Sequence, residues 1–271
     1  MANTNVEKGM HRDVLPVVYV IDTSGSMDGD RISAVNQAMR EALVLLRDVA
    51  DNNANAEVRV AVLKFATSAD WVTPQLTPLE DFFWNDLTAA GTTEVTHALE
   101  KLDDKFSSTQ LFNGGNGYKT PVVIFMSDGA PTDPEKWEKK LEYVINNNKW
   151  FRVSIKVAVA IGDDADRACL AKLVGNNAEA VVSVHDHDTL KSFIKAVTLN
   201  TLMAGETRNT GAGSNTATEI AKKSVADTQK DVDDIFSNFN ILNFLDTSSS
   251  ADSSSSSNDS TWNGDDDGNW N

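Results

Sequence analysis

The chain has a single cysteine, Cys169, among 271 residues, so no disulfide bond can form within it. A lone cysteine is typical of proteins from a reducing compartment. No stretch approaches the roughly 18 to 20 consecutive apolar residues that a membrane-spanning helix needs. The segment Met1–Arg12 is polar and lacks the apolar centre of a signal peptide. These absences predict a soluble, cytoplasmic protein.

Basic side chains are also scarce, with 24 Lys and Arg against 40 Asp and Glu and a net charge of -16. Residues 206–271 hold 12 acidic and 4 basic side chains, and no Lys, Arg or His occurs from residue 231 onward. Such an acidic surface repels phosphate backbones and anionic lipid. We therefore expect no nucleic acid and no membrane as the main partner, and instead a basic protein surface or a cation.

The composition changes near Met203, where apolar runs and helical patterns give way to Ser, Asn, Asp and Gly. We predict an N-terminal extension (1–9), one domain (10–205) and an acidic Ser/Asn/Asp-rich tail (206–271). Within the tail, apolar residues recur at three- and four-residue spacing over 231–246, which predicts an amphipathic segment. This segment either docks on a partner or closes the domain core, and both alternatives stay open. The serine-rich stretch that follows is expected to be disordered and is a candidate for phosphorylation.

Strand and helix patterns alternate through the domain. Unbroken apolar, β-branched runs such as Leu15–Ile21 and Pro121–Met126 predict strands that are buried on both faces. Asp133, followed by Pro134, predicts a helix start at which the carboxylate caps the backbone. The other predicted strands are 58–65, 73–76, 153–161 and 180–184, and the predicted helices are 30–49, 95–106, 133–147, 167–174 and 188–203.

This alternation predicts an α/β fold, an open, doubly wound, mostly parallel sheet with helices on both faces, because parallel strands need crossover connections. Ligands of such sheets bind beyond the carboxyl ends of the strands. Polar loops follow the first strand (residues 22–27, DTSGSM) and the central strand (residues 127–129, SDG), and a third opens a helix between them (residues 91–94, GTTE). Convergence of these loops would place two carboxylates and three hydroxyls around one point.

The segments DTSGSM, GTTEVTHAL and SDGAPTD resemble the three parts of the metal-ion-dependent adhesion site (MIDAS) of the von Willebrand factor A (VWA) family. The resemblance extends from about Asp13 to Leu202 and implies the Rossmann-like fold of that family. Among its branches, the chain looks most like the bacterial TerY-like proteins associated with tellurium resistance. That closer resemblance implies a stress-response or signalling complex. It also implies a kinase or phosphatase as a partner, since TerY-like proteins are often encoded beside such enzymes.

The resemblance implies five metal ligands: Asp22, Ser24, Ser26, Thr93 and Asp128. Ser24 and Ser26 would bind through their hydroxyls, and Thr93 would bind directly or through water. Asp22 and Asp128 would hold coordinated waters or bind the metal themselves. All these donors are hard oxygens, which favour Mg²⁺, while Ca²⁺ or Mn²⁺ could replace it.

One position departs from the family pattern. The family usually shows Gly-Gly-Thr where this chain has Gly91, Thr92 and Thr93. Counting back from Ala98 and Leu99 selects Thr93 as the ligand, and Thr92 stays open as the alternative.

Neutral hydroxyls among the ligands would leave the charge of the cation incompletely compensated, so an Asp or Glu from a partner protein could complete its coordination. We therefore predict a non-enzymatic, metal-dependent protein-binding module. A metal-assisted phosphoryl-transfer enzyme is an alternative, but haloacid dehalogenase-type enzymes need an acid where this chain has Ser24. A metal-free scaffold is a further alternative. A second metal site at residues 185–188 (HDHD) is disfavoured, because neighbouring side chains diverge and Asp188 suits a helix N-cap.

Overall fold

The computed structural model describes residues 12–51, 56–113, 117–129 and 131–207. The predicted extension (1–9) and the amphipathic segment (231–246) lie outside these residues. The strands are β1 (Asp13–Asp22), β2 (Ala56–Phe65), β3 (Ala69–Trp71), β4 (Thr77–Pro78), β5 (Val122–Ser127), β6 (Ile155–Ile161) and β7 (Val181–Val184). They form one seven-stranded sheet in the order β3-β2-β1-β5-β6-β7, with β4 also paired to β2. The short strands β3 and β4 are antiparallel to β2, and the other pairs are parallel.

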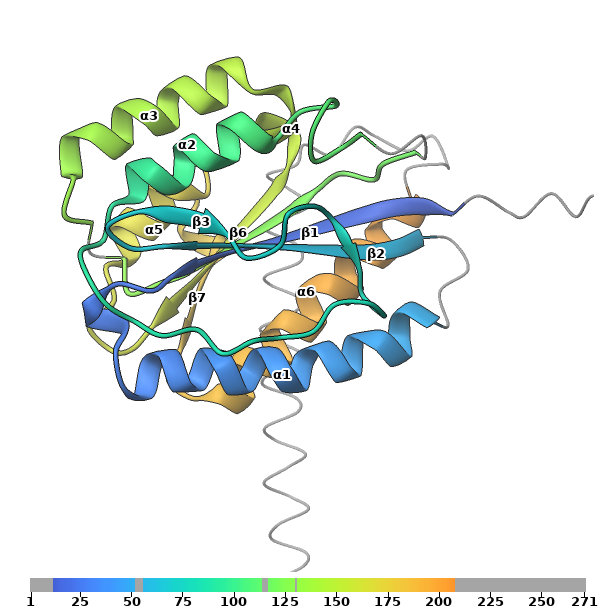
Figure 1. Cartoon of the computed structure of the whole chain (residues 1–271), viewed down its shortest axis with the longest axis horizontal. Helices are drawn as coiled ribbons and strands as arrows, with labels where there is room; N and C mark the ends of the chain where they lie inside the picture. The colour runs from blue at the N-terminus through green and yellow to red at the C-terminus, as the bar shows by residue number, and fades with distance from the viewer. Residues whose placement is uncertain (1–11, 52–55, 114–116, 130, 208–271) are drawn as a thin grey trace, which may run out of the picture. The chain divides into compact units, whose positions relative to one another are not determined.

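Helices cover both faces of this sheet. They are α1 (Asp30–Asp51), α2 (Val95–Lys105), α3 (Pro134–Asn147), α4 (Lys149–Val153), α5 (Arg167–Leu173) and α6 (His187–Thr207). Helices α1 and α6 pack together on one face, and α2 and α3 pack together on the other (Figure 1). The predicted doubly wound α/β fold is therefore confirmed. No helix of the described ranges is long and apolar enough to cross a membrane.

Strand β1 lies in the middle of the sheet, between β2 and β5. Every residue of β1 after Asp13 is buried, as expected for an apolar strand that helices cover on both faces. Ile21 is level with Met126 of β5, and Asp22 is level with Phe65 of β2. The carboxyl ends of the three central strands therefore meet at one edge, where the two predicted carboxylates emerge.

The predicted strand at 73–76 is wrong. The chain forms the shorter strands β3 and β4 on either side of this segment. The backbone N–H of Val62 donates to the side-chain oxygen of Thr73 at 2.9 Å, so a hydroxyl replaces a backbone acceptor there. Pro74 follows and has no N–H to donate, which interrupts the ladder.

The strand predicted to start at Val153 starts two residues later, because the unpredicted helix α4 ends at Val153. The side chain of Asn148 caps this helix by accepting a hydrogen bond from the backbone N–H of Phe151 at 3.0 Å. Five residues are too few for the apolar periodicity that reveals a helix in a sequence.

Lys156 of β6 is partly buried beside the ring of Phe151, and burial lowers its pKa from 10.5 to about 8. Between these pH values the unfolded chain binds more protons at this site than the folded chain does, so this group makes stability rise with pH. We expect the stability of the native chain relative to a Lys156→Met variant to increase by about 2 kcal/mol from pH 7 to pH 10. Urea denaturation at both pH values measures this difference, with exposed Lys136→Met as the control. A difference that does not change with pH would contradict the lowered pKa.

Candidate metal centre

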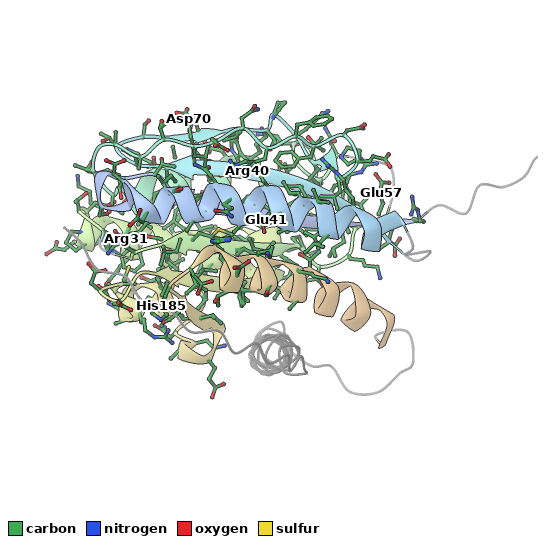
Figure 2. All side chains as sticks on the ribbon, turned by 90° about the horizontal axis from the view of Figure 1, so that it is seen from below. Arg31, Arg40, Glu41, Glu57, Asp70 and His185 are labelled. Atoms are coloured by element: carbon green, nitrogen blue, oxygen red, sulfur yellow. The ribbon has the colours of Figure 1, made fainter. Side chains whose placement is uncertain are left out.

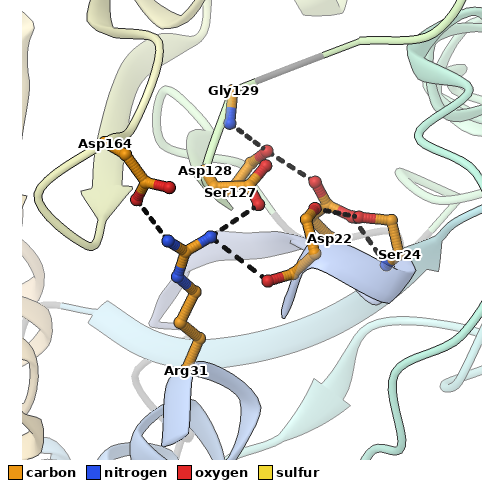
Figure 3. A network of polar contacts seen from close by, with 8 residues as sticks. Asp22, Ser24, Arg31, Ser127, Asp128, Gly129 and Asp164 are labelled. Carbon is orange, nitrogen blue, oxygen red and sulfur yellow. Dashed lines mark hydrogen bonds and ion pairs between the residues drawn. The ribbon is translucent and has the colours of Figure 1, made fainter. Parts of the chain in front are cut away.

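Asp22 closes β1 with a fully buried side chain that joins two loops. Its Oδ1 accepts a hydrogen bond from the backbone N–H of Ser24 at 2.8 Å, and its Oδ2 accepts one from the Ser127 hydroxyl at 2.6 Å (Figure 3). Ser127 in turn accepts from the backbone N–H of Gly129 at 2.8 Å. The carboxylate of Asp22 therefore connects the loop after β1 to the loop after β5 and fixes their relative position.

Burial raises the pKa of Asp22, and hydrogen bonds from Ser127 and Ser24 partly offset that shift. The nearby negative charge of Asp128 raises the pKa further. Burial therefore disfavours the charged form of Asp22, and a positive charge placed close to this carboxylate would stabilise that form.

The hydroxyl oxygens of Ser24 and Ser26 lie 3.1 Å apart. A single 3₁₀ turn over Gly25–Met27 brings the two side chains together. Ser24 is buried and Ser26 is exposed, so the pair extends from the interior to the surface. The backbones of both serines take part in hydrogen bonds that fix this loop, Ser24 with Asp22 and Ser26 with Arg31.

Asp128 follows β5 and is only 4% exposed. Its Oδ2 accepts a hydrogen bond from Arg31 Nη1 at 3.0 Å, whereas its buried Oδ1 has no hydrogen-bond partner within the described residues. A buried carboxylate oxygen without a donor is costly, because it loses hydration and gains nothing in return. A cation bound beside this oxygen would supply the missing partner.

The loop that carries Thr93 attaches to the loop after β1 through the backbone. Ala90 N donates to Thr23 O, and Gly25 N donates to Gly91 O, both at 2.8 Å. Gly91 has a φ of 89°, and a Cβ there would lie 2.4 Å from the hydroxyl oxygen of Thr67. The glycine therefore allows this close approach of the two loops.

The two candidate threonines differ in environment. Thr92 is exposed, and its N–H and hydroxyl both bond to the Thr67 hydroxyl, at 3.0 and 3.1 Å. Thr93 is 4% exposed, and its backbone oxygen accepts two hydrogen bonds from Thr132, at 2.9 and 3.1 Å. Its hydroxyl has no partner within the part of the chain that the structure describes. These contacts favour Thr93 over Thr92 as the residue available to a cation.

Asp133 lies next to this loop, and its side chain caps a different helix from the one predicted. It does precede α3, but its carboxylate makes no capping bond to that helix. It accepts instead from the backbone N–H groups of Val95 and Thr96, at 3.3 and 3.0 Å, and from the Thr96 hydroxyl. Asp133 therefore caps α2 from another segment and anchors the helix that starts two residues after Thr93.

Arg31, in the first turn of α1, also belongs to this site and was not among the predicted site residues. Its guanidinium donates to Ser26 O at 3.1 Å and to Asp128, and it forms an ion pair with Asp164. The N-terminal turn of a helix disfavours a positive charge because of the helix dipole. An arginine at such an unfavourable position, a few residues after the DTSGSM motif, indicates that its charge has a partner elsewhere in the fold, and this feature of the sequence could have identified Arg31.

The residues at 185–188 separate in the structure. His185 pairs with Asp163 at 2.7 Å, and Asp186 caps α6 by accepting from Thr189, so the prediction of Asp188 as the N-cap is wrong. Asp188 and His187 do lie near Glu41 in a geometry that could hold a metal ion. Lys191 already bridges that group, with its Nζ 2.6 Å from Glu41 and 2.7 Å from Asp188. The ammonium therefore occupies the position that a cation would take.

A family model described as the von Willebrand factor type A domain matches residues 17–196. Inter-alpha-trypsin inhibitor heavy chain H4 of Homo sapiens is 26% identical over 181 residues, which cover 63% of this chain and 18% of that protein. This chain therefore spans less than a fifth of the length of that relative.

Two solved structures share the fold. A von Willebrand factor type A protein from Catenulispora acidiphila aligns with a TM-score of 0.51 and 20% identity, over 70% of this chain and 43% of that one. The pilus adhesin SpaC from Lactobacillus rhamnosus GG, in an open conformation, aligns with a TM-score of 0.54 and 14% identity, over 71% of this chain and 30% of that one. Since the family model spans most of the chain and the sheet has the matching architecture, the chain belongs to the von Willebrand factor type A domain family.

Proposed function

We propose that Asp22, Ser24, Ser26, Thr93 and Asp128 together hold one divalent cation, with Mg²⁺ as the expected ion and Ca²⁺ or Mn²⁺ as substitutes. The observation that carries this proposal is the buried Oδ1 of Asp128, which has no hydrogen-bond donor in the described residues. The raised pKa of Asp22 supports it, because both features call for positive charge at the same edge of the sheet. Hard oxygen donors suit these ions better than softer metals.

We further propose that the bound ion serves to grip a carboxylate of a partner protein. Three of the five proposed ligands are neutral hydroxyls, and one of the two carboxylates is already paired with Arg31. A divalent cation in this setting keeps part of its charge and favours an anionic ligand. An Asp or Glu side chain meets this need, so the domain acts by binding rather than by catalysis.

The closer resemblance to TerY-like proteins remains part of this proposal. It suggests a bacterial stress-response or signalling complex with a kinase or phosphatase among its members, and a cytoplasmic location. The acidic composition supports a basic surface on the partner around the carboxylate that binds.

Affinity capture with the purified chain tests the proposed function. The partner is expected to be retained with Mg²⁺ and lost with a chelator, and to be lost from a Ser24→Ala variant even with Mg²⁺ present. Ser107→Ala is a matched control, because Ser107 is partly exposed and, among the described residues, its hydroxyl bonds to Thr109 alone. Partner binding that survives both the chelator and Ser24→Ala would instead support a metal-free scaffold. Turnover of phosphorylated substrates that requires Mg²⁺ and Ser24 would support the enzyme alternative.

A further inference from the structure

Arg31 connects three loops at the carboxyl edge of the sheet. Its Nη1 donates to the backbone oxygen of Ser26 and to Oδ2 of Asp128, at 3.1 and 3.0 Å. Its Nη2 pairs with Asp164 in the loop after β6. Figure 3 shows the guanidinium between the two carboxylates. One cationic side chain therefore bridges the loops that follow β1, β5 and β6.

The loop after β6 leaves room for this guanidinium. Gly162 has a φ of 92°, and a Cβ at this position would lie 2.9 Å from Arg31 Nε and 3.0 Å from Nη2. Any larger residue would displace the side chain. The placement of Arg31 therefore depends on a glycine in a neighbouring loop as well as on its ion pairs.

The two ion pairs of Arg31 differ in exposure. The side chains of Arg31 and Asp128 are 25% and 5% exposed, whereas that of Asp164 is 73% exposed. Water screens the outer pair strongly and the inner pair much less. The charge of Arg31 therefore acts mainly on Asp128, one of the proposed metal ligands.

We propose that the positive charge of Arg31 compensates the charge of Asp128 and so keeps the site assembled without a metal. The same charge lowers the affinity of the site for divalent cations. This inference rests on the proposed function, because it concerns the same site. The guanidinium neutralises Asp128 through Oδ2 and leaves Oδ1 available. A cation beside Oδ1 is then repelled by the fixed positive charge of Arg31. A carboxylate from a partner reduces this repulsion, so cation and partner bind more tightly together than separately.

Isothermal titration of the metal-free full chain with Mg²⁺ or Mn²⁺ alone tests this inference. Arg31→Gln is expected to bind either cation roughly tenfold or more tightly than the native chain, because a nearby repulsive charge is gone. Its thermal midpoint without metal is expected to fall, since Asp128 loses its partner, and to recover with Mg²⁺. Arg31→Lys keeps the positive charge and is expected to bind the cations much as the native chain does.

Arg40→Gln is the matched control. Arg40 lies further along α1 and pairs with the exposed Asp86, away from the site (Figure 2). The cation affinity of the Arg40→Gln variant is expected to equal that of the native chain. Arg31→Met is a second neutral variant, in case Arg31→Gln does not fold.

The possible outcomes separate the two proposals. Unchanged or weaker cation binding by a folded neutral variant, with binding by the native chain intact, overturns the inference and leaves the proposed function standing. Binding by neither protein contradicts both. A neutral variant that folds only when Mg²⁺ is present supports the inference, and one that stays unfolded with Mg²⁺ contradicts it.

Discussion

Asp22→Asn is expected to weaken Mg²⁺ or Mn²⁺ binding by at least about 100-fold while leaving the metal-free protein as stable as the native chain or more so. The loss follows because one of the two proposed carboxylate ligands becomes neutral. The stability follows from the raised pKa of Asp22, which shows that burial disfavours its charged form. A neutral amide removes that cost, its oxygen can still accept the hydrogen bond from Ser24, and its NH₂ group can donate to the Ser127 hydroxyl in place of the bond that Ser127 now donates.

The opposite directions of these two effects make the experiment decisive. Titration calorimetry measures the cation affinity, and thermal unfolding in chelator measures the stability. Asp13→Asn is a suitable control, because Asp13 is exposed at the other end of the same strand. Cation binding by Asp22→Asn that matches the native chain would contradict the proposed site. A fall in both affinity and metal-free stability would instead indicate a general disturbance of the fold.

The sign of the Asp22 shift also predicts how the metal-free protein responds to pH. The folded chain binds a proton at Asp22 more readily than the unfolded chain does, so protonation favours folding. This contribution makes the metal-free protein less stable as the pH rises through the titration range of Asp22, and Asp22→Asn removes it. Measuring the stability of the metal-free native chain and of Asp22→Asn across acidic pH therefore isolates the contribution of the Asp22 carboxyl group.

Asp133→Ala is expected to lower the free energy of unfolding by about 2 to 3 kcal/mol. The carboxylate is buried and accepts three hydrogen bonds at the start of α2, from Val95 N, Thr96 N and the Thr96 hydroxyl. Truncation leaves these three donors without a partner, in a buried setting at Val95 and a partly buried one at Thr96. Since α2 begins directly after the Thr93 loop, cation affinity is expected to fall as well.

Urea denaturation monitored by tryptophan fluorescence measures the first effect of Asp133→Ala. Asp104→Ala is the control, because Asp104 is exposed on the same helix and its side chain makes no hydrogen bond in the described part of the chain. Asp104→Ala is expected to change the free energy of unfolding by no more than about 0.5 kcal/mol. A loss below about 1 kcal/mol for Asp133→Ala would show that water replaces the carboxylate as the cap.

Sequence patterns predicted the fold where an element is long and its apolar period is clear. Strands β1 and β5 and helices α1 and α3 were expected within a few residues of their bounds, because runs such as Leu15–Ile21 have few other stable arrangements. Short elements were missed or misplaced. The helix α4 and the strands β3 and β4 contain five residues or fewer, and local contacts such as the Thr73 hydroxyl decide where they lie.

The sequence alone determined the doubly wound sheet, because the order of its apolar runs allows few other arrangements. It also determined that Asp22 and Asp128 lie at strand ends, because polar motifs end those runs. Tertiary structure alone decided which polar groups pair across loops. Asp133 caps α2 and not its own helix, and Asp128 has one oxygen paired with Arg31 and the other without a donor. Backbone periodicity reports which face of an element is buried, whereas these partners lie 37 and 97 residues apart and depend on how the loops converge.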